Sequence, residues 1–75
     1  MKNNPNLEVV VSNRNVDGWQ VFRVNKSEGF VFGVEKFTDR QTAMERVEYL
    51  ADQYSCIIEV VEQNKTTGSV EIIHQ

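Results

Sequence analysis

Few side chains in this sequence have the types and spacing that catalysis requires. Its one histidine, His74, is the penultimate residue, and its one cysteine, Cys56, begins an apolar segment. A histidine at a chain end is rarely held rigidly enough for proton transfer, and a cysteine in apolar surroundings usually packs as a small hydrophobe. The sequence contains no phosphate loop, dinucleotide fingerprint or clustered set of metal ligands. We therefore predict a protein that is not an enzyme and has no cofactor and no metal site.

An aromatic pair, Phe30 and Phe32, stands between two glycines in the segment EGFVFGV. The RNA-recognition motif also places aromatic residues on a strand to stack on bases, but its leading position is basic, whereas Glu28 stands here. Because side chains alternate along a strand, Phe30, Phe32 and Val34 are expected to share one face. We predict that this stripe belongs to the core and lies beneath a helix. The helix residues expected above it are Val47, Leu50 and Tyr54.

Gly33 and Trp19 are candidate protein-binding residues, each with a structural alternative. Gly33 is expected on the face opposite the phenylalanines, where a missing side chain either bends the strand or leaves room for a partner's backbone. Trp19 follows a glycine at the start of a strand. An indole in that position is more often a half-buried packing residue than a ligand contact.

The hydrophobic pattern predicts five strands and one helix. The strands are expected at Leu7–Ser12, Trp19–Val24, Phe30–Phe37, Cys56–Glu62 and Val70–Ile73. Apolar residues spaced three and four apart predict an amphipathic helix of about four turns, with Thr38 and Gln41 as its capping box. Short turns between strands indicate antiparallel hairpins. The fold class is therefore α+β, a small antiparallel β-sheet with one amphipathic helix packed on one face, in the order β-β-β-α-β-β.

Length and composition indicate one small globular domain. The chain has 75 residues, of which 40% are hydrophobic and 25% charged. We expect residues 1–6, MKNNPN, to be a flexible N-terminal tail and residues 7–75 to form a single α+β domain. A single cysteine, with no signal peptide and no apolar run of membrane-spanning length, favours a cytoplasmic location and no membrane partner.

The net charge of −3 is unevenly distributed along the chain. Residues 1–36 carry a balance of +1, whereas residues 37–75 carry a balance of −4. Glu45, Glu48 and Asp52 are expected to form an acidic strip on the solvent side of the helix, partly offset by Arg46. The strip is either a solvated helix face or a contact for a basic protein. An acidic protein is a poor candidate for binding nucleic acid, because such binding relies on lysine and arginine.

Several short motifs resemble a family of small bacterial domains known as domain of unknown function 2188. The resemblance starts at Asp17–Val21, DGWQV, and continues at Phe37–Ala43, FTDRQTA, where the helix opens. Ala51, the strand Ile57–Val61 and a glycine turn at Gly68 extend it over most of the chain. The resemblance implies the fold described above and supplies no activity.

We favour a non-catalytic small protein-interaction module that acts as a homodimer. Apolar residues on both faces of the strand Cys56–Glu62 motivate this hypothesis, because both faces of the sheet are then expected to be buried. One alternative is a small phage or mobile-element inhibitor or accessory protein that presents its acidic helix to a basic, nucleic-acid-binding protein. Another is a nucleic-acid-binding domain that uses the more basic N-terminal half. The residues expected in that role are Arg14, Arg23, Lys26 and Lys36.

Overall fold

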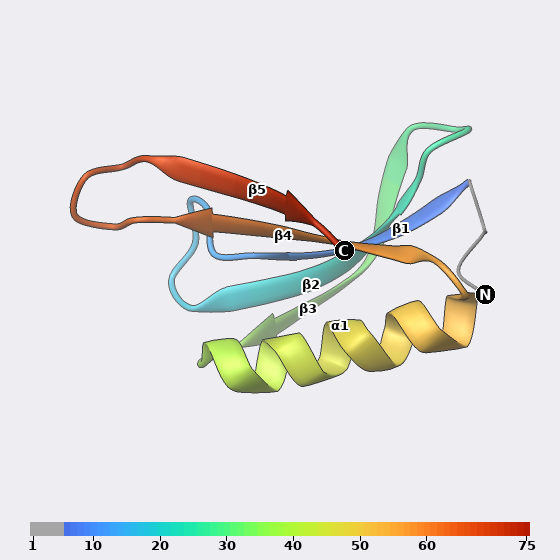
Figure 1. The fold of residues 1–75 in the computed structure, drawn as a ribbon, viewed down its shortest axis with the longest axis horizontal. Coiled ribbons are helices and arrows are strands. Elements are labelled where there is room, and N and C mark those ends of the chain that lie inside the picture. Colours follow the sequence, from blue (N-terminus) through green and yellow to red (C-terminus); the bar gives the residue numbers. More distant parts are fainter. Residues whose placement is uncertain (1–5) are drawn as a thin grey trace.

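A computed structural model describes residues 6–75, which form one five-stranded sheet with a single helix on one side (Figure 1). The flexible tail predicted for residues 1–6 lies outside the described residues except for Asn6. The carbonyl of Asn6 accepts a hydrogen bond of 2.8 Å from the backbone N–H of Lys26, so the described chain begins against the turn after the second strand.

The predicted element order and the α+β class are confirmed. The elements are β1 (Leu7–Ser12), β2 (Trp19–Asn25), β3 (Phe30–Phe37), α1 (Arg40–Tyr54), β4 (Ile57–Gln63) and β5 (Val70–His74). Across the sheet the strands run in the order β3-β2-β1-β4-β5. The sheet is not wholly antiparallel, as predicted, but mixed, because β1 pairs with β4 in parallel while the other three pairings are antiparallel.

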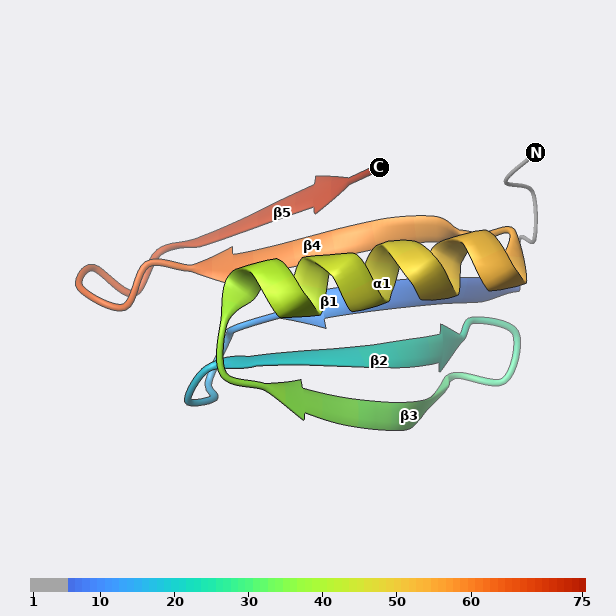
Figure 2. The same ribbon diagram turned by 90° about the horizontal axis from the view of Figure 1, so that it is seen from below.

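The parallel pair arises from the helix. Strands β3 and β1 run in the same direction. For the next strand, β4, to run parallel to them, the chain must first return to the end of the sheet where β3 began, and α1 supplies this crossover connection. The crossover carries the chain past β2 and β1, so β4 lies beside β1 in the centre of the sheet (Figure 2). The hairpins predicted from the short turns are the antiparallel pairs β1–β2, β2–β3 and β4–β5.

The hydrophobic core lies between α1 and the central strands. Alternate residues of β1, β2 and β4 face the helix, and α1 contributes residues three and four apart. The fully buried side chains of this layer include Val9, Val11, Val21, Val47 and Val60. Small residues of α1, Ala43 and Ala51, are also fully buried, which lets the helix approach the sheet closely.

The prediction that Phe30, Phe32 and Val34 form a core stripe beneath the helix is wrong. Phe30 is 46% exposed and Val34 is 53% exposed, because β3 is an edge strand. A helix about 10–12 Å across cannot cover five strands whose outer members are about 19 Å apart. Val47 and Leu50 pack instead on β1, β2 and β4, and the helix leaves both outer strands largely bare (Figure 2).

Helix α1 begins one residue later than its predicted capping box. Asp39, not Thr38, is the N-cap, and its carboxylate accepts a hydrogen bond of 2.9 Å from the backbone N–H of Thr42. The helix ends at a left-handed Ser55, whose backbone N–H bonds to the carbonyls of the last turn. In the described part of the chain, residues 6–75, no helix is long and apolar enough to cross a membrane.

The Asp39 cap predicts a pH-dependent contribution to stability. The backbone N–H and hydroxyl of Thr42 donate to the carboxylate and lower the pKa of Asp39 below its ordinary value of 3.8. Its ionised form therefore stabilises the folded state above about pH 4, and this stabilisation is lost as the pH falls through the lowered pKa. We expect Asp39→Ala to lower the melting temperature by a few degrees at neutral pH.

The same substitution is expected to have a smaller effect at acidic pH below the lowered pKa of Asp39, where the wild-type carboxyl is protonated. Thermal unfolding followed by circular dichroism at both pH values measures the difference. Asp39→Asn is the matched control, since an amide still caps the helix but does not titrate. An equal effect of Asp39→Ala at both pH values would contradict this role of the carboxylate.

Candidate functional site

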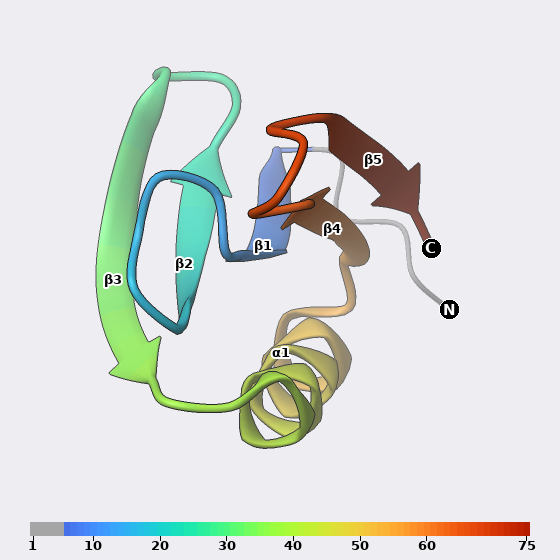
Figure 3. The ribbon, with the colours of Figure 1, turned by 90° about the vertical axis from the view of Figure 1, so that its left-hand side faces the viewer.

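The face of the sheet that α1 does not cover is rich in apolar side chains, and we call it the open face. In the view along the sheet in Figure 3, the helix lies on one side and no strand or helix of residues 6–75 covers the other. Strand register places nine apolar residues on it. They are Val10, Phe22, Val24, Val31, Val34, Ile57, Val61, Val70 and Ile72.

The open face is buried at its centre and exposed toward both edges. Val10 on β1 is 3% exposed and Val61 on β4 is 8% exposed, because neighbouring side chains of the same face cover them. Val31 and Val34 on β3 are each 53% exposed, and Ile72 on β5 is also 53% exposed. Exposed β-branched residues at both edges of the same sheet face make that face a candidate interaction surface.

Three polar residues on the open face form a compact cluster, which we call the Glu8–Glu59–His74 cluster. Glu8 lies on β1, Glu59 on β4 and His74 on β5, and Glu59 and His74 are direct cross-strand partners. Nε2 of His74 is 2.8 Å from Oε1 of Glu59 and 3.9 Å from Oε2 of Glu8. The side chains become more exposed in the order Glu8 12%, Glu59 24% and His74 58%.

Electrostatics within this cluster disfavour an ionised Glu8. Burial raises the pKa of Glu8, and the neighbouring Glu59 carboxylate raises it further, while Lys26 and His74 partly offset the rise. A cation close to both carboxylates would remove the repulsion between them. The cluster therefore holds two carboxylates and one imidazole in a position where negative charge is only partly compensated.

Sequence reasoning missed the Glu8–Glu59–His74 cluster. It treated His74 as a poorly held terminal residue, but backbone hydrogen bonds between Ile58 and Gln75, of 3.1 and 2.8 Å, extend the β4–β5 ladder past it. The three residues are also 15 or more positions apart along the chain. Alternation of side chains along each strand predicts which residues share a face of the sheet. It does not predict that the three residues meet, because that also requires β1, β4 and β5 to be neighbours.

A β-bulge in β3 changes which residues face the helix. Val21 pairs with Glu35 and Arg23 pairs with Phe32, so Gly33 and Val34 together stand opposite Phe22. The extra residue moves Val34 to the open face and brings Glu35 to the helix side. Phe30 and Phe32 remain on the helix side, with their ring centroids 5.6 Å apart.

An arginine of β2 fills the space beside the bulge. The guanidinium of Arg23 lies over the rings of Phe32 and Tyr54, 5.6 Å from each centroid, and Nη1 donates to the Tyr54 hydroxyl over 2.9 Å. Glu35 accepts from Arg23 over 3.3 Å and from Nε of Arg46, on α1, over 3.0 Å. This network links the bulged edge strand to the helix.

Of the two roles considered for Gly33, bending the strand is the one found. Its φ of +67° lies in the left-handed region, and a Cβ at this position would stand 2.7 Å from the Arg23 guanidinium. The expected position of Gly33 opposite the phenylalanines is wrong, because its Cβ direction points to the Arg23 guanidinium on the helix side. The space beside Gly33 is therefore filled from within the chain and not left for a partner's backbone. Trp19 likewise packs in the core, is only 8% exposed and lies beneath the guanidinium of Arg40.

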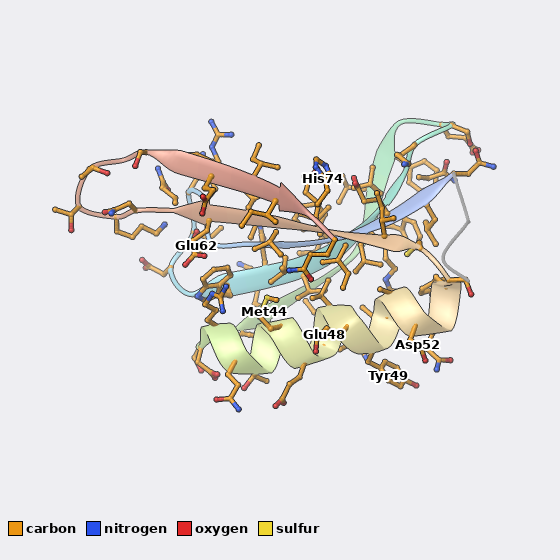
Figure 4. The ribbon with its side chains drawn as sticks, in the orientation of Figure 1. Met44, Glu48, Tyr49, Asp52, Glu62 and His74 are labelled. Atoms are coloured by element: carbon orange, nitrogen blue, oxygen red, sulfur yellow. The ribbon has the colours of Figure 1, made fainter. Side chains whose placement is uncertain are left out.

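The acidic strip predicted on α1 is present. Glu45, Glu48 and Asp52 are all exposed, and Figure 4 shows Glu48 and Asp52 on the helix, with His74 across the sheet from them. Arg46, which was expected to offset the strip, turns toward Glu35 and stacks over the ring of Tyr49 at 5.5 Å. The strip is therefore less compensated than the sequence suggests.

The four basic residues considered for nucleic-acid binding do not share one surface. Arg14 lies in the turn after β1, Lys26 in the turn at the opposite end of β2, and Lys36 on the open face. The side chain of Arg23 is only 16% exposed and is held by Glu35 on the helix side. Cys56 is buried, as the sequence predicts, with 1% of its surface exposed.

Comparisons with protein-family models, with curated proteins and with solved structures find no match for this chain. The resemblance to domain of unknown function 2188 therefore stays a prediction, and the function has to be argued from the fold and its surfaces.

Proposed function

We propose that this chain is a non-catalytic protein-interaction module that forms a homodimer through its open face. The observation that carries the proposal is the set of apolar residues on the open face, of which Val31, Val34 and Ile72 are each about half exposed. Apolar sheet faces are normally covered by another packed layer, and α1 supplies one on the opposite side only. Among residues 6–75, no element supplies that layer, so a partner chain is the expected source.

A second copy of the chain is the partner that this face fits best. The exposed apolar residues lie at both its β3 and its β5 ends. A twofold axis that runs parallel to the strands, along the middle of the face, would place the β3 end of one copy over the β5 end of the other. A standard interface takes about 800 Å² from each partner, which is about a sixth of the 4759 Å² accessible surface of the chain.

Charge also favours self-association through the open face and not through the helix. The ionisable residues of the open face are Lys36 on the edge strand β3 and the Glu8–Glu59–His74 cluster, which extends from the central strand β1 to the edge strand β5. Two helices brought together would instead oppose their acidic strips. Packing through the open faces buries apolar surface and keeps the two acidic strips apart.

The oligomeric state in solution tests the proposal. Light scattering coupled to size-exclusion chromatography is expected to report twice the chain mass of 8.7 kDa. Because the driving force is hydrophobic, added salt should not dissociate the dimer. A monomer that persists at high protein concentration would overturn the proposal.

A second candidate function is supported by the uncompensated acidic strip. Glu45, Glu48 and Asp52 are exposed, and Arg46 is held away from them by Glu35. Such a strip suits a basic protein, including one that binds nucleic acid. Pull-down with mass spectrometry is expected to recover a partner that is released by salt and lost when all three residues are changed to lysine. Equal capture by this variant would remove the candidate.

A further inference from the structure

We propose that Glu8, Glu59 and His74 form a binding site for one divalent transition-metal ion on the open face of the sheet. The site is complete within one chain and does not depend on the proposed homodimer. It brings one nitrogen and two carboxylate oxygens together from three adjacent strands.

The distances within the cluster suit a single ion. One potential ligand atom from each of the three residues can be chosen so that all lie within 4.8 Å of one another. A tetrahedral ion with bonds of about 2.0 Å holds its ligand atoms roughly 3.3 Å apart. Closing around an ion would therefore separate Nε2 of His74 from Oε1 of Glu59, now 2.8 Å apart, and draw Oε2 of Glu8 closer than its present 3.9 Å. These are shifts that side chains can make without moving the strands.

The sheet holds the ligands in place better than their positions along the chain suggest. His74 is the cross-strand partner of Glu59, and the backbone bonds between Ile58 and Gln75 extend the ladder on its far side. Glu8 is 12% exposed on β1, between β2 and β4. A site on three paired strands has less freedom to lose on binding than one on loops.

The ligand types select the class of ion. An imidazole nitrogen suits Zn²⁺, Co²⁺, Ni²⁺ and Fe²⁺, whereas Mg²⁺ and Ca²⁺ prefer sites made of oxygen atoms alone. Two carboxylates neutralise the charge of a divalent ion. With three protein ligands, a further coordination position faces away from the sheet, where water or a donor from a bound protein can occupy it.

Zn²⁺ binding by the full chain tests the site. Isothermal titration at neutral pH is expected to give one Zn²⁺ per chain, and excess Mg²⁺ should not compete. Glu8→Gln, Glu59→Gln and His74→Gln should each weaken binding by more than about tenfold, since loss of even an outer-shell partner costs roughly 10–100-fold. Glu71→Gln is the matched control, because it removes a carboxylate from β5 on the other face.

A measurement on the wild-type protein keeps the test independent of how the variants fold. Co²⁺ is paramagnetic and is expected to broaden the ring resonances of His74, the only histidine, at stoichiometric amounts. The Co²⁺-loaded protein should also show the visible absorption of Co²⁺ coordinated by the imidazole nitrogen and the carboxylate oxygens. Unperturbed His74 resonances, displacement by Mg²⁺, or equal Zn²⁺ affinity in His74→Gln and Glu71→Gln would each overturn the proposal.

Discussion

Ile72→Lys is expected to dissociate the proposed homodimer, whereas Ile73→Lys should leave it intact. Ile72 points to the open face and is 53% exposed in the single chain, so a lysine there can be solvated in the monomer. In the proposed dimer the same charge would be buried in the interface. An unpaired charge in an interface costs about 3 kcal/mol or more, which weakens association at least about a hundredfold.

Ile73 provides the matched control because it is the next residue of β5 and faces the opposite side of the sheet. It is 41% exposed, so a lysine there introduces the same charge into a similar environment of the monomer. Sedimentation equilibrium of both variants measures the dissociation constants, and circular dichroism checks the fold. If both substitutions dissociate the dimer equally, the interface is the β5 edge and not the open face.

Gly33→Ala is expected to lower the free energy of unfolding by about 2–4 kcal/mol. Part of the loss is the strain of a left-handed backbone, because φ at Gly33 is +67°. The rest comes from the new Cβ, which would stand 2.7 Å from the Arg23 guanidinium and displace it. Arg23 would then lose its hydrogen bonds to Tyr54 and Glu35.

Gly29→Ala separates the two contributions. Gly29 also has a left-handed φ, +73°, but a Cβ there would meet no atom within 4 Å. Gly29→Ala should therefore lower the free energy of unfolding by only about 1–2 kcal/mol. Chemical denaturation of the two variants gives the difference, which measures the contact with Arg23. Equal losses would mean that Arg23 moves away without cost.

The two experiments concern opposite sides of the sheet. Glu35 of the edge strand β3 is bound by Arg23 and by Arg46 of α1, which secures the strand to the helix. Val31 and Val34 of the same strand contribute to the open face. A loosened bulge would therefore also disturb the proposed dimer. We expect Gly33→Ala to weaken the proposed homodimer moderately. Ile72→Lys should weaken it strongly without loss of the fold.

Much of the fold was predictable because it depends on local pattern. Apolar residues two positions apart predicted the five strands, and apolar residues three and four positions apart predicted the helix, which together gave the element order. The turn residues predicted the hairpins. The helix start was displaced by one residue, since Thr38 and Asp39 are both good N-caps and their competition is settled by the backbone conformation. The acidic strip was predictable as well, because helix periodicity alone places Glu45, Glu48 and Asp52 together.

The order of the strands across the sheet was decided only by the tertiary structure. Phe30 has a large apolar side chain of the kind that usually lies in a core, yet it is exposed because β3 lies at an edge that one helix cannot reach. The bulge at Gly33 reversed the facing of Val34 and Glu35, which strict alternation could not predict. The Glu8–Glu59–His74 cluster required β1, β4 and β5 to be neighbours. Sequence by itself therefore determined the elements, whose pattern is local, while long-range pairing determined which side chains meet and which remain open to a partner.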